Sequence, residues 1–121
     1  PRRVIGIDAS ATLEKTRGQV GRIARSTAKL IGLERDLHED EIMVLEGWAG
    51  DYYGIPVEST LEAIRLGASL EAMITDPVYE GKSLAGLIDL VSGREISADS
   101  NVLFAHLGGQ LALNAYSGVF R

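Results

Sequence analysis

Short apolar runs alternate with segments of helical period along this chain, and this alternation constrains the fold more than any other feature. Residues 3–10 begin with an apolar run and end in small, polar residues, as a buried parallel strand does before a βα loop. A mostly helical spacing of apolar residues then continues to Gly32. The apolar runs at 42–45 and 102–105 predict two more strands. Such alternation is typical of an α/β fold, here a three-layer arrangement with helices covering a parallel sheet.

Three further helices are expected beyond the one that ends at Gly32. Ser59 or Thr60 caps the first of them, which runs to Met73. The second carries an apolar face over 84–91, and the third covers 111–119. A parallel sheet of three strands is narrow, and buried parallel strands need both faces covered. We therefore expect residues 1–121 to form one portion of a larger α/β domain.

Composition excludes several classes of function. A net charge of -5 with scattered positive charges argues against nucleic acid as a partner, because phosphate binding needs clustered Lys and Arg. The chain has no cysteine, so it offers neither disulfides nor a thiolate metal site, and no two histidines stand at metal-ligand spacing. No signal-peptide pattern opens the chain, which fits a cytoplasmic location. Residues 102–120 lack charged side chains, yet their polar residues disfavour a membrane helix.

The turn at 76–83 places two chemically capable side chains, Tyr79 and Glu80, directly before a helix. A tyrosine can exchange a proton, and a glutamate can pair with a protonated nitrogen. The alternative is a surface tyrosine and a glutamate that stabilises the helix dipole. Tyr53, in a glycine-flanked loop, has the same two interpretations. His106 is a further candidate base, although a lone histidine beside apolar residues is usually structural.

Five segments together are similar, in order and spacing, to the C-terminal part of the 1-aminocyclopropane-1-carboxylate (ACC) deaminase family, and the similarity runs from about Arg3 to Arg121. That family and its relative, D-cysteine desulfhydrase, are fold-type II enzymes with a tryptophan-synthase-β-like fold that use pyridoxal phosphate. The segments are Ile5-Gly6-Ile7-Asp8-Ala9-Ser10, Tyr53-Gly54-Ile55-Pro56, Thr60-Leu61-Glu62-Ala63-Ile64-Arg65-Leu66, Thr75-Asp76-Pro77-Val78-Tyr79-Glu80-Gly81-Lys82-Ser83 and Ala105-His106-Leu107-Gly108-Gly109.

This resemblance implies a reaction and a set of site residues. The family opens the cyclopropane ring of a small amino acid substrate and releases 2-oxobutyrate and ammonia, with pyridoxal phosphate as electron sink. Its two active-site tyrosines match Tyr53 and Tyr79, and its acid facing the pyridine nitrogen matches Glu80. Family members form homodimers or larger assemblies, so the resemblance also implies a homo-oligomer.

Two positions separate the deaminase from the desulfhydrase within the resemblance. Desulfhydrases tend to have Ser or Thr at the position of Glu80 and Thr at that of Leu107, so this chain is similar to the deaminase at both. Departures from the family pattern occur at Asp51-Tyr52 and at Gln110-Leu111, which put the shapes of these loops in question.

The family's cofactor-binding lysine, its substrate-binding serine and its glycine-rich phosphate loop precede the position that corresponds to Arg3. Lys82 matches a different family position and does not replace that lysine. We therefore expect this chain alone to be inactive, and its partner to be the N-terminal portion of the enzyme. The rival interpretation is a non-catalytic α/β interaction module.

Overall fold

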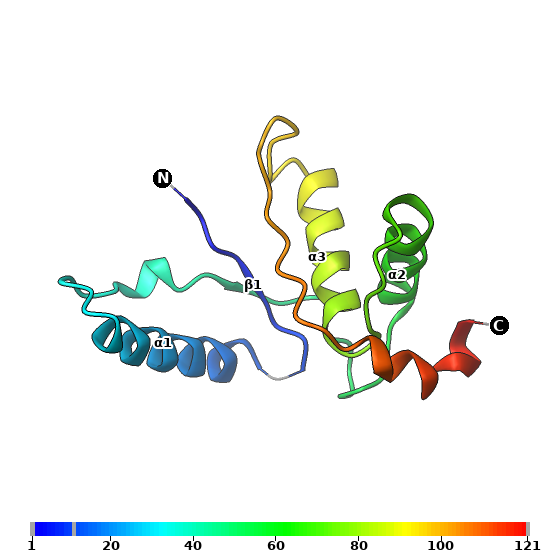
Figure 1. Cartoon of the computed structure of the whole chain (residues 1–121), viewed down its shortest axis with the longest axis horizontal. Helices are drawn as coiled ribbons and strands as arrows, with labels where there is room; N and C mark the ends of the chain where they lie inside the picture. Colours follow the sequence, from blue (N-terminus) through cyan, green and yellow to red (C-terminus); the bar gives the residue numbers. More distant parts are fainter. Residues whose placement is uncertain (1, 11, 121) are drawn as a thin grey trace.

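The computed structural model describes residues 2–10 and 12–120, and it has the mixed α/β fold that the sequence predicts (Figure 1). Strand β1 (Gly6–Ile7) pairs in parallel with β2 (Val44–Leu45), with Gly6 opposite Val44 and Ile7 opposite Leu45. Helix α1 (Leu13–Leu30) connects the two strands, as a parallel pair requires. Helices α2 (Glu58–Glu71) and α3 (Glu80–Ser92) follow β2.

Three short 3-10 helices complete the described elements. The first, η1 (Glu39–Glu41), precedes β2. The other two, η2 (Gln110–Asn114) and η3 (Ser117–Phe120), lie near the end of the chain. In Figure 1 the strand pair lies between α1 on one side and the α2–α3 pair on the other. Among the described residues, no helix is long and apolar enough to span a membrane.

The core lies where α2 and α3 pack against each other. Ala63 of α2 and Leu84 and Ala85 of α3 are its buried centre. Small side chains at this contact let the two helices approach closely. Partly buried apolar side chains from several segments surround them: Trp48, Met73, Leu87, Ile88 and Phe104.

Gly86 lets β1 pack directly on α3. A Cβ atom at this position would lie 2.9 Å from Cδ1 of Ile7 and 3.3 Å from Cδ2 of Trp48, which is closer than such atoms normally approach. The absence of a side chain at Gly86 therefore sets the distance between the sheet and the helix that carries the candidate site.

The third predicted strand is wrong. Within the described residues, segment 102–105 forms no strand hydrogen bonds. Phe104 packs on the core, whereas Leu103 is 95% exposed. An extended chain becomes a strand only beside a partner edge, and this segment runs back along α3 instead of along β1 or β2 (Figure 1).

Two helix predictions also need correction. The helix expected over 111–119 is replaced by η2 and η3, because Asn114, Ser117 and Gly118 favour turns over a continuous α-helix. Helix α2 begins at Glu58, before the expected caps Ser59 and Thr60. Thr60 is fully buried inside the helix, so packing and not capping explains it.

Candidate active site

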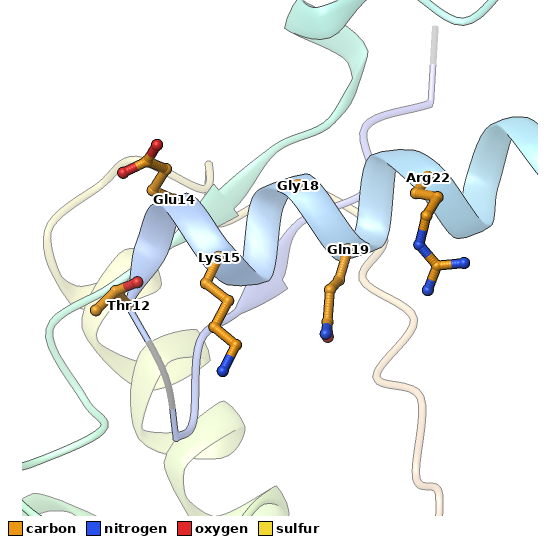
Figure 2. Close-up of a pocket in the computed structure, with 6 residues that line it drawn as sticks. All are labelled: Thr12, Glu14, Lys15, Gly18, Gln19 and Arg22. Atoms are coloured by element: carbon orange, nitrogen blue, oxygen red, sulfur yellow. The ribbon is translucent and has the colours of Figure 1, made fainter.

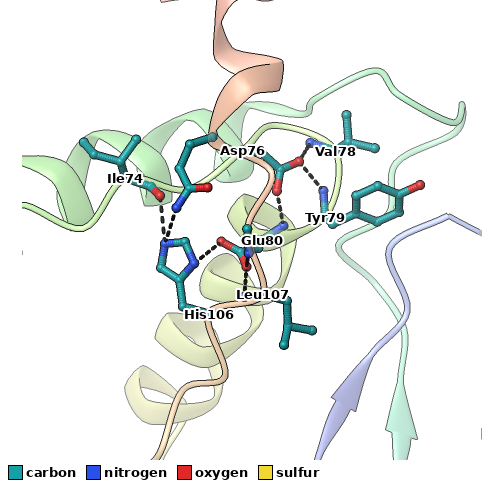
Figure 3. A network of polar contacts seen from close by, with 9 residues as sticks. Ile74, Asp76, Val78, Tyr79, Glu80, His106 and Leu107 are labelled. Carbon is teal, nitrogen blue, oxygen red and sulfur yellow. Dashed lines mark hydrogen bonds and ion pairs between the residues drawn. The ribbon is translucent and has the colours of Figure 1, made fainter.

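The first turn of α3 is held by the buried carboxylate of Asp76 (Figure 3). Its Oδ1 accepts hydrogen bonds from the backbone N–H groups of Val78 (2.8 Å) and Tyr79 (2.9 Å), and its Oδ2 accepts one from Glu80 (3.0 Å). The first N–H groups of a helix have no partner within the helix, and Asp76 supplies one. The sequence interpretation missed this role, although an acidic residue shortly before a helix is a recognisable signal.

Glu80 is the first residue of α3, and its side chain turns inward so that the residue is only 6% exposed. Its Oε1 accepts hydrogen bonds from the backbone N–H groups of Leu107 and of Gly108, the latter at 2.8 Å. A negative charge is favourable at this end of a helix. Backbone groups from a segment 27 and 28 residues away therefore fix the position of the carboxylate.

His106 bridges this carboxylate and the turn before α3 (Figure 3). Its Nδ1 lies 2.9 Å from Oε2 of Glu80, and its Nε2 lies 2.9 Å from the carbonyl oxygen of Ile74. The side-chain amide of Gln110 lies 3.5 Å from the same Nε2. The sequence interpretation favoured a structural histidine, and it could not reveal that this side chain contacts Glu80.

Gly109 allows segment 106–109 to come this close. It has φ of +89°, and a Cβ atom there would lie 2.5 Å from Oδ2 of Asp76. Only glycine combines this backbone conformation with such an approach. The carboxylates of Asp76 and Glu80 are thus organised by the same short segment.

Tyr53 and Tyr79 meet beside this network. Their hydroxyl oxygens are 2.5 Å apart, and their rings make an edge-to-face contact with centroids 6.2 Å apart. Tyr53 is 64% exposed and Tyr79 48%, so both phenols are accessible from solvent. The hydrogen bond with Tyr53, followed by partial burial and the charge of Asp76, raises the pKa of Tyr79 above its usual value of 10.

The backbone N–H of Leu107 donates to Glu80, and its side chain faces solvent. The residue is 89% exposed although its N–H group is bound. Tyr79 directly precedes Glu80, and Tyr53 contacts Tyr79. The structure therefore brings together the four residues that the sequence singled out: Tyr53, Tyr79, Glu80 and Leu107.

Lys82, in the first turn of α3, joins the helix to the loops after both strands. The buried Nζ donates to the carbonyl oxygens of Ala9 (3.0 Å) and Ala49 (2.5 Å). Burial lowers the pKa of the Lys82 ammonium, and the carboxylates of Asp8 and Asp76 oppose this shift. The lysine thus positions the two loops at the carboxyl ends of the parallel strands, where α/β sheets bind ligands.

The surface has a hollow beside Tyr53 and another on α1. One of about 390 Å³ lies between the loops after β1 and β2 and is lined by Ser10, Thr12, Lys15 and residues 49–53. The other, of about 460 Å³, is an open depression on the outer side of α1 (Figure 2). Its side chains, including Lys15, Gln19 and Arg22, project outward without converging on a point. No group of three or more His, Asp or Glu side chains suited to a metal occurs among the described residues.

The site combines an inward-facing carboxylate, a histidine and two accessible phenols. The carboxylate can hold a positively charged nitrogen, and the phenols can pass a proton. The fold of the chain matches a solved structure described as an ACC deaminase homologue. The TM-score is 0.67 and the sequence identity 25%, and the match covers 78% of this chain and 28% of the other.

Curated relatives at higher identity carry a more particular description. The chain is 60% identical over 119 residues to a 1-aminocyclopropane-1-carboxylate deaminase of Ralstonia nicotianae and 58% identical over 120 residues to one of Methylobacterium nodulans. It is also 58% identical over 118 residues to a probable one of Schizosaccharomyces pombe. No family model matches the chain. The chain is therefore homologous to ACC deaminases over 98% of its own length, and it spans 35% of the length of the Ralstonia relative.

Proposed function

We propose that this chain contributes the tyrosine pair and the acidic residue to a pyridoxal-phosphate-dependent ACC deaminase, which converts ACC to 2-oxobutyrate and ammonia. The observations that support this proposal are the hydroxyl contact between Tyr53 and Tyr79 and the bond from the Leu107 N–H to Glu80, which link three separate segments through the neighbours Tyr79 and Glu80. The homology to ACC deaminases supports the same assignment.

The residues present fit the pyridine ring of pyridoxal phosphate. Glu80 accepts hydrogen bonds from two backbone N–H groups and contacts His106, which leaves one of the roughly four acceptor positions of a carboxylate for a ring nitrogen. A negative charge there favours a protonated nitrogen. Bound pyridoxal phosphate supplies the electron sink for cleavage of the substrate.

Tyr79 and Tyr53 act as the groups that hold and move protons beside the substrate. Their hydroxyls form a pair, so a proton taken up by one oxygen can be released from the other. The phenol of Tyr79 is protonated at neutral pH and can donate a hydrogen bond to the reacting group.

Leu107 is the proposed determinant of substrate choice. Its exposed apolar side chain would face a substrate carbon atom, whereas a hydroxyl at this position would favour a polar substrate. The alternative activity, D-cysteine desulfhydration, is disfavoured by Glu80 and Leu107 together.

We also propose that these residues belong to a larger domain of an oligomeric enzyme. The two strands would belong to the larger three-layer parallel sheet of a fold-type II enzyme, with residues 1–121 as the C-terminal portion of its large domain. Exposed apolar side chains next to the sheet support this view. The working enzyme would be a cytoplasmic homo-oligomer whose N-terminal portion supplies the lysine and the phosphate loop.

The proposal is tested on the protein as its source makes it. We expect a visible absorption band from bound cofactor and formation of 2-oxobutyrate and ammonia from ACC. Tyr79→Phe should lower kcat by a factor of about 100 to 10,000, the usual contribution of proton transfer. Glu80→Gln should weaken cofactor binding and lower kcat, whereas the control Glu62→Gln on the exposed side of α2 should not.

Three results would contradict the proposal or redirect it. A colourless protein that acts on neither substrate would support the non-catalytic interaction module. Sulfide release from D-cysteine without turnover of ACC would establish the desulfhydrase. Full activity of Tyr79→Phe would remove that residue from the site.

A further inference from the structure

The side chain of His106 lies against the Glu80 carboxylate, and its surroundings restrict where it carries a proton. Nδ1 faces a carboxylate oxygen of Glu80, and Nε2 faces the carbonyl oxygen of Ile74, each at 2.9 Å. Neither oxygen can donate a hydrogen bond, so each nitrogen that bonds must carry a proton. The neutral form with a proton on Nε2 alone would turn the Nδ1 lone pair toward the carboxylate.

Two forms of the ring therefore agree with the geometry. The imidazolium donates from both nitrogens and satisfies both oxygens. The neutral form with a proton on Nδ1 satisfies Glu80 and gives up the bond to the Ile74 carbonyl, and its Nε2 can accept from the Gln110 amide instead. The amide of Gln110, 3.5 Å from Nε2, can turn either of its polar atoms to the ring. Both acceptable forms have the same consequence, because Nδ1–H donates to Oε2 of Glu80 in each.

The backbone alone leaves the carboxylate incompletely fixed. The N–H groups of Leu107 and Gly108 both bind Oε1, so the carboxylate could still rotate about the axis through that oxygen. The second oxygen, Oε2, is buried and has no other hydrogen-bond partner among the described residues, and Nδ1 of His106 lies 2.9 Å from it. A bond from this nitrogen would determine the plane of the carboxylate. The charged groups near the ring are Glu80 itself and Asp76, which lies against Gly109 in the same segment.

We infer that His106 is a positioning residue: its Nδ1–H group donates to Oε2 of Glu80 and fixes the orientation in which this carboxylate meets its ligand. This role rests on the proposed function of Glu80 toward a pyridine nitrogen. The histidine acts through Glu80, and segment 106–109 then positions the carboxylate through three donors that follow one another in sequence.

The test uses two variants that lose the same contact with Ile74 but differ at Glu80. His106→Asn retains an amide donor near the position of Nδ1 and cannot reach the Ile74 carbonyl. His106→Leu has a similar size and no donor. If the histidine is merely structural, both variants change stability and cofactor binding alike. If it positions Glu80, the Asn variant stays within about threefold of the wild type in pyridoxal phosphate Kd, and the Leu variant weakens by tenfold or more.

A second measurement needs no cofactor. In the natural protein freed of cofactor and labelled with 15N-histidine, the His106 signal, assigned by its loss in the variants, should show a protonated Nδ1 wherever the fold is intact. Gln110→Leu should leave this state unchanged, because Gln110 contacts only the other nitrogen.

Two outcomes would overturn the inference. One is an unprotonated Nδ1 in the folded protein, and the other is equal cofactor affinity in the Asn and Leu variants. Failure of the wild type to bind pyridoxal phosphate would instead contradict the proposed function. The nitrogen spectrum would still decide whether His106 donates to Glu80, so the two failures are distinguishable.

Discussion

Tyr53 and Tyr79 show how strongly a pair of exposed side chains can affect each other. Their hydroxyl oxygens share a hydrogen bond, and the pKa of Tyr79 rises when Tyr79 is the donor, because ionisation would remove the proton that it donates. The neutral form of Tyr79 is therefore favoured, and its pKa rises. This effect arises from a contact between residues 26 positions apart.

Removal of Tyr53 should bring the pKa of Tyr79 back toward 10. A spectrophotometric titration of phenolate absorption should show that Tyr53→Phe lowers the pH at which Tyr79 ionises. Tyr52→Phe, a neighbouring control, should leave this ionisation where it is. An unchanged Tyr79 transition in Tyr53→Phe would mean that the hydroxyl contact does not exist in solution.

The same pair determines how stability varies at high pH. A raised pKa in the folded state means that the contribution of Tyr79 to the free energy of unfolding is complete below pH 10, its unfolded value. It is lost as the pH rises through the higher folded value. Urea unfolding above pH 10 should therefore show a loss in the wild type that Tyr79→Phe lacks.

Individual site residues could be predicted from the sequence to a limited extent. Tyr53, Tyr79, Glu80 and Leu107 were singled out because family resemblance attaches roles to residue types at fixed spacings, and these roles stay predictions. Asp76 and His106 were not found as partners, because hydrogen bonds depend on which segments meet in space. Short polar side chains serve many purposes, and only the fold selects one of them.

At the scale of elements, segment 106–109 packs against the N-terminus of α3. It has no regular secondary structure, yet its backbone N–H groups and its glycines determine how closely it approaches Asp76 and Glu80. Its position therefore depends on close packing at Gly109 and not on a hydrogen-bonded ladder.

Gly109→Ala should destabilise the protein by about 2 kcal/mol more than Gly108→Ala. Both glycines have positive φ, at +89° and +119°, so both substitutions carry backbone strain. A Cβ atom at Gly109 would collide with Asp76, whereas one at Gly108 has its nearest described neighbour, Oε1 of Gln110, at 3.9 Å. Free energies of unfolding from urea titration measure the difference, and equal values would show that Asp76 and Gly109 are farther apart than described.

The elements themselves were predictable where local signals were strong. The helical spacing of apolar residues predicts α1, α2 and α3, and short apolar runs predict β1 and β2. The run at 102–105 has the same appearance as a strand, but strand formation also needs a neighbouring edge. Pattern alone therefore predicted an extended conformation correctly and its hydrogen bonding wrongly.

At the scale of the whole molecule, the chain exposes many large apolar side chains. Leu103, Leu107 and Leu111 follow one another at four-residue intervals in the segment beside α3 and are almost fully exposed. Two short parallel strands also leave sheet edges without partners among the described residues. Surfaces of this kind are typical of regions that other protein segments cover.

Leu103→Gln tests whether this surface is covered in the natural protein. If nothing covers the side chain, the substitution should change the free energy of unfolding by less than about 0.5 kcal/mol. If the remainder of a deaminase packs on it, the loss should be about 2 kcal/mol or more. Asn101→Gln, a polar change two residues away, is the control, and urea unfolding is the measurement. A neutral Leu103→Gln would favour the interaction module over the enzyme.

The role proposed for Leu107 in substrate choice uses a different part of the residue from its contact with Glu80. The anchoring of the carboxylate uses the backbone N–H of residue 107, and the side chain is left out of it. Any amino acid except proline supplies that N–H group. Single mutations can therefore replace the side chain of residue 107 without removing the N–H group that anchors Glu80. With the side-chain role proposed above, an evolving enzyme would change its substrate preference and keep its acidic group in place throughout.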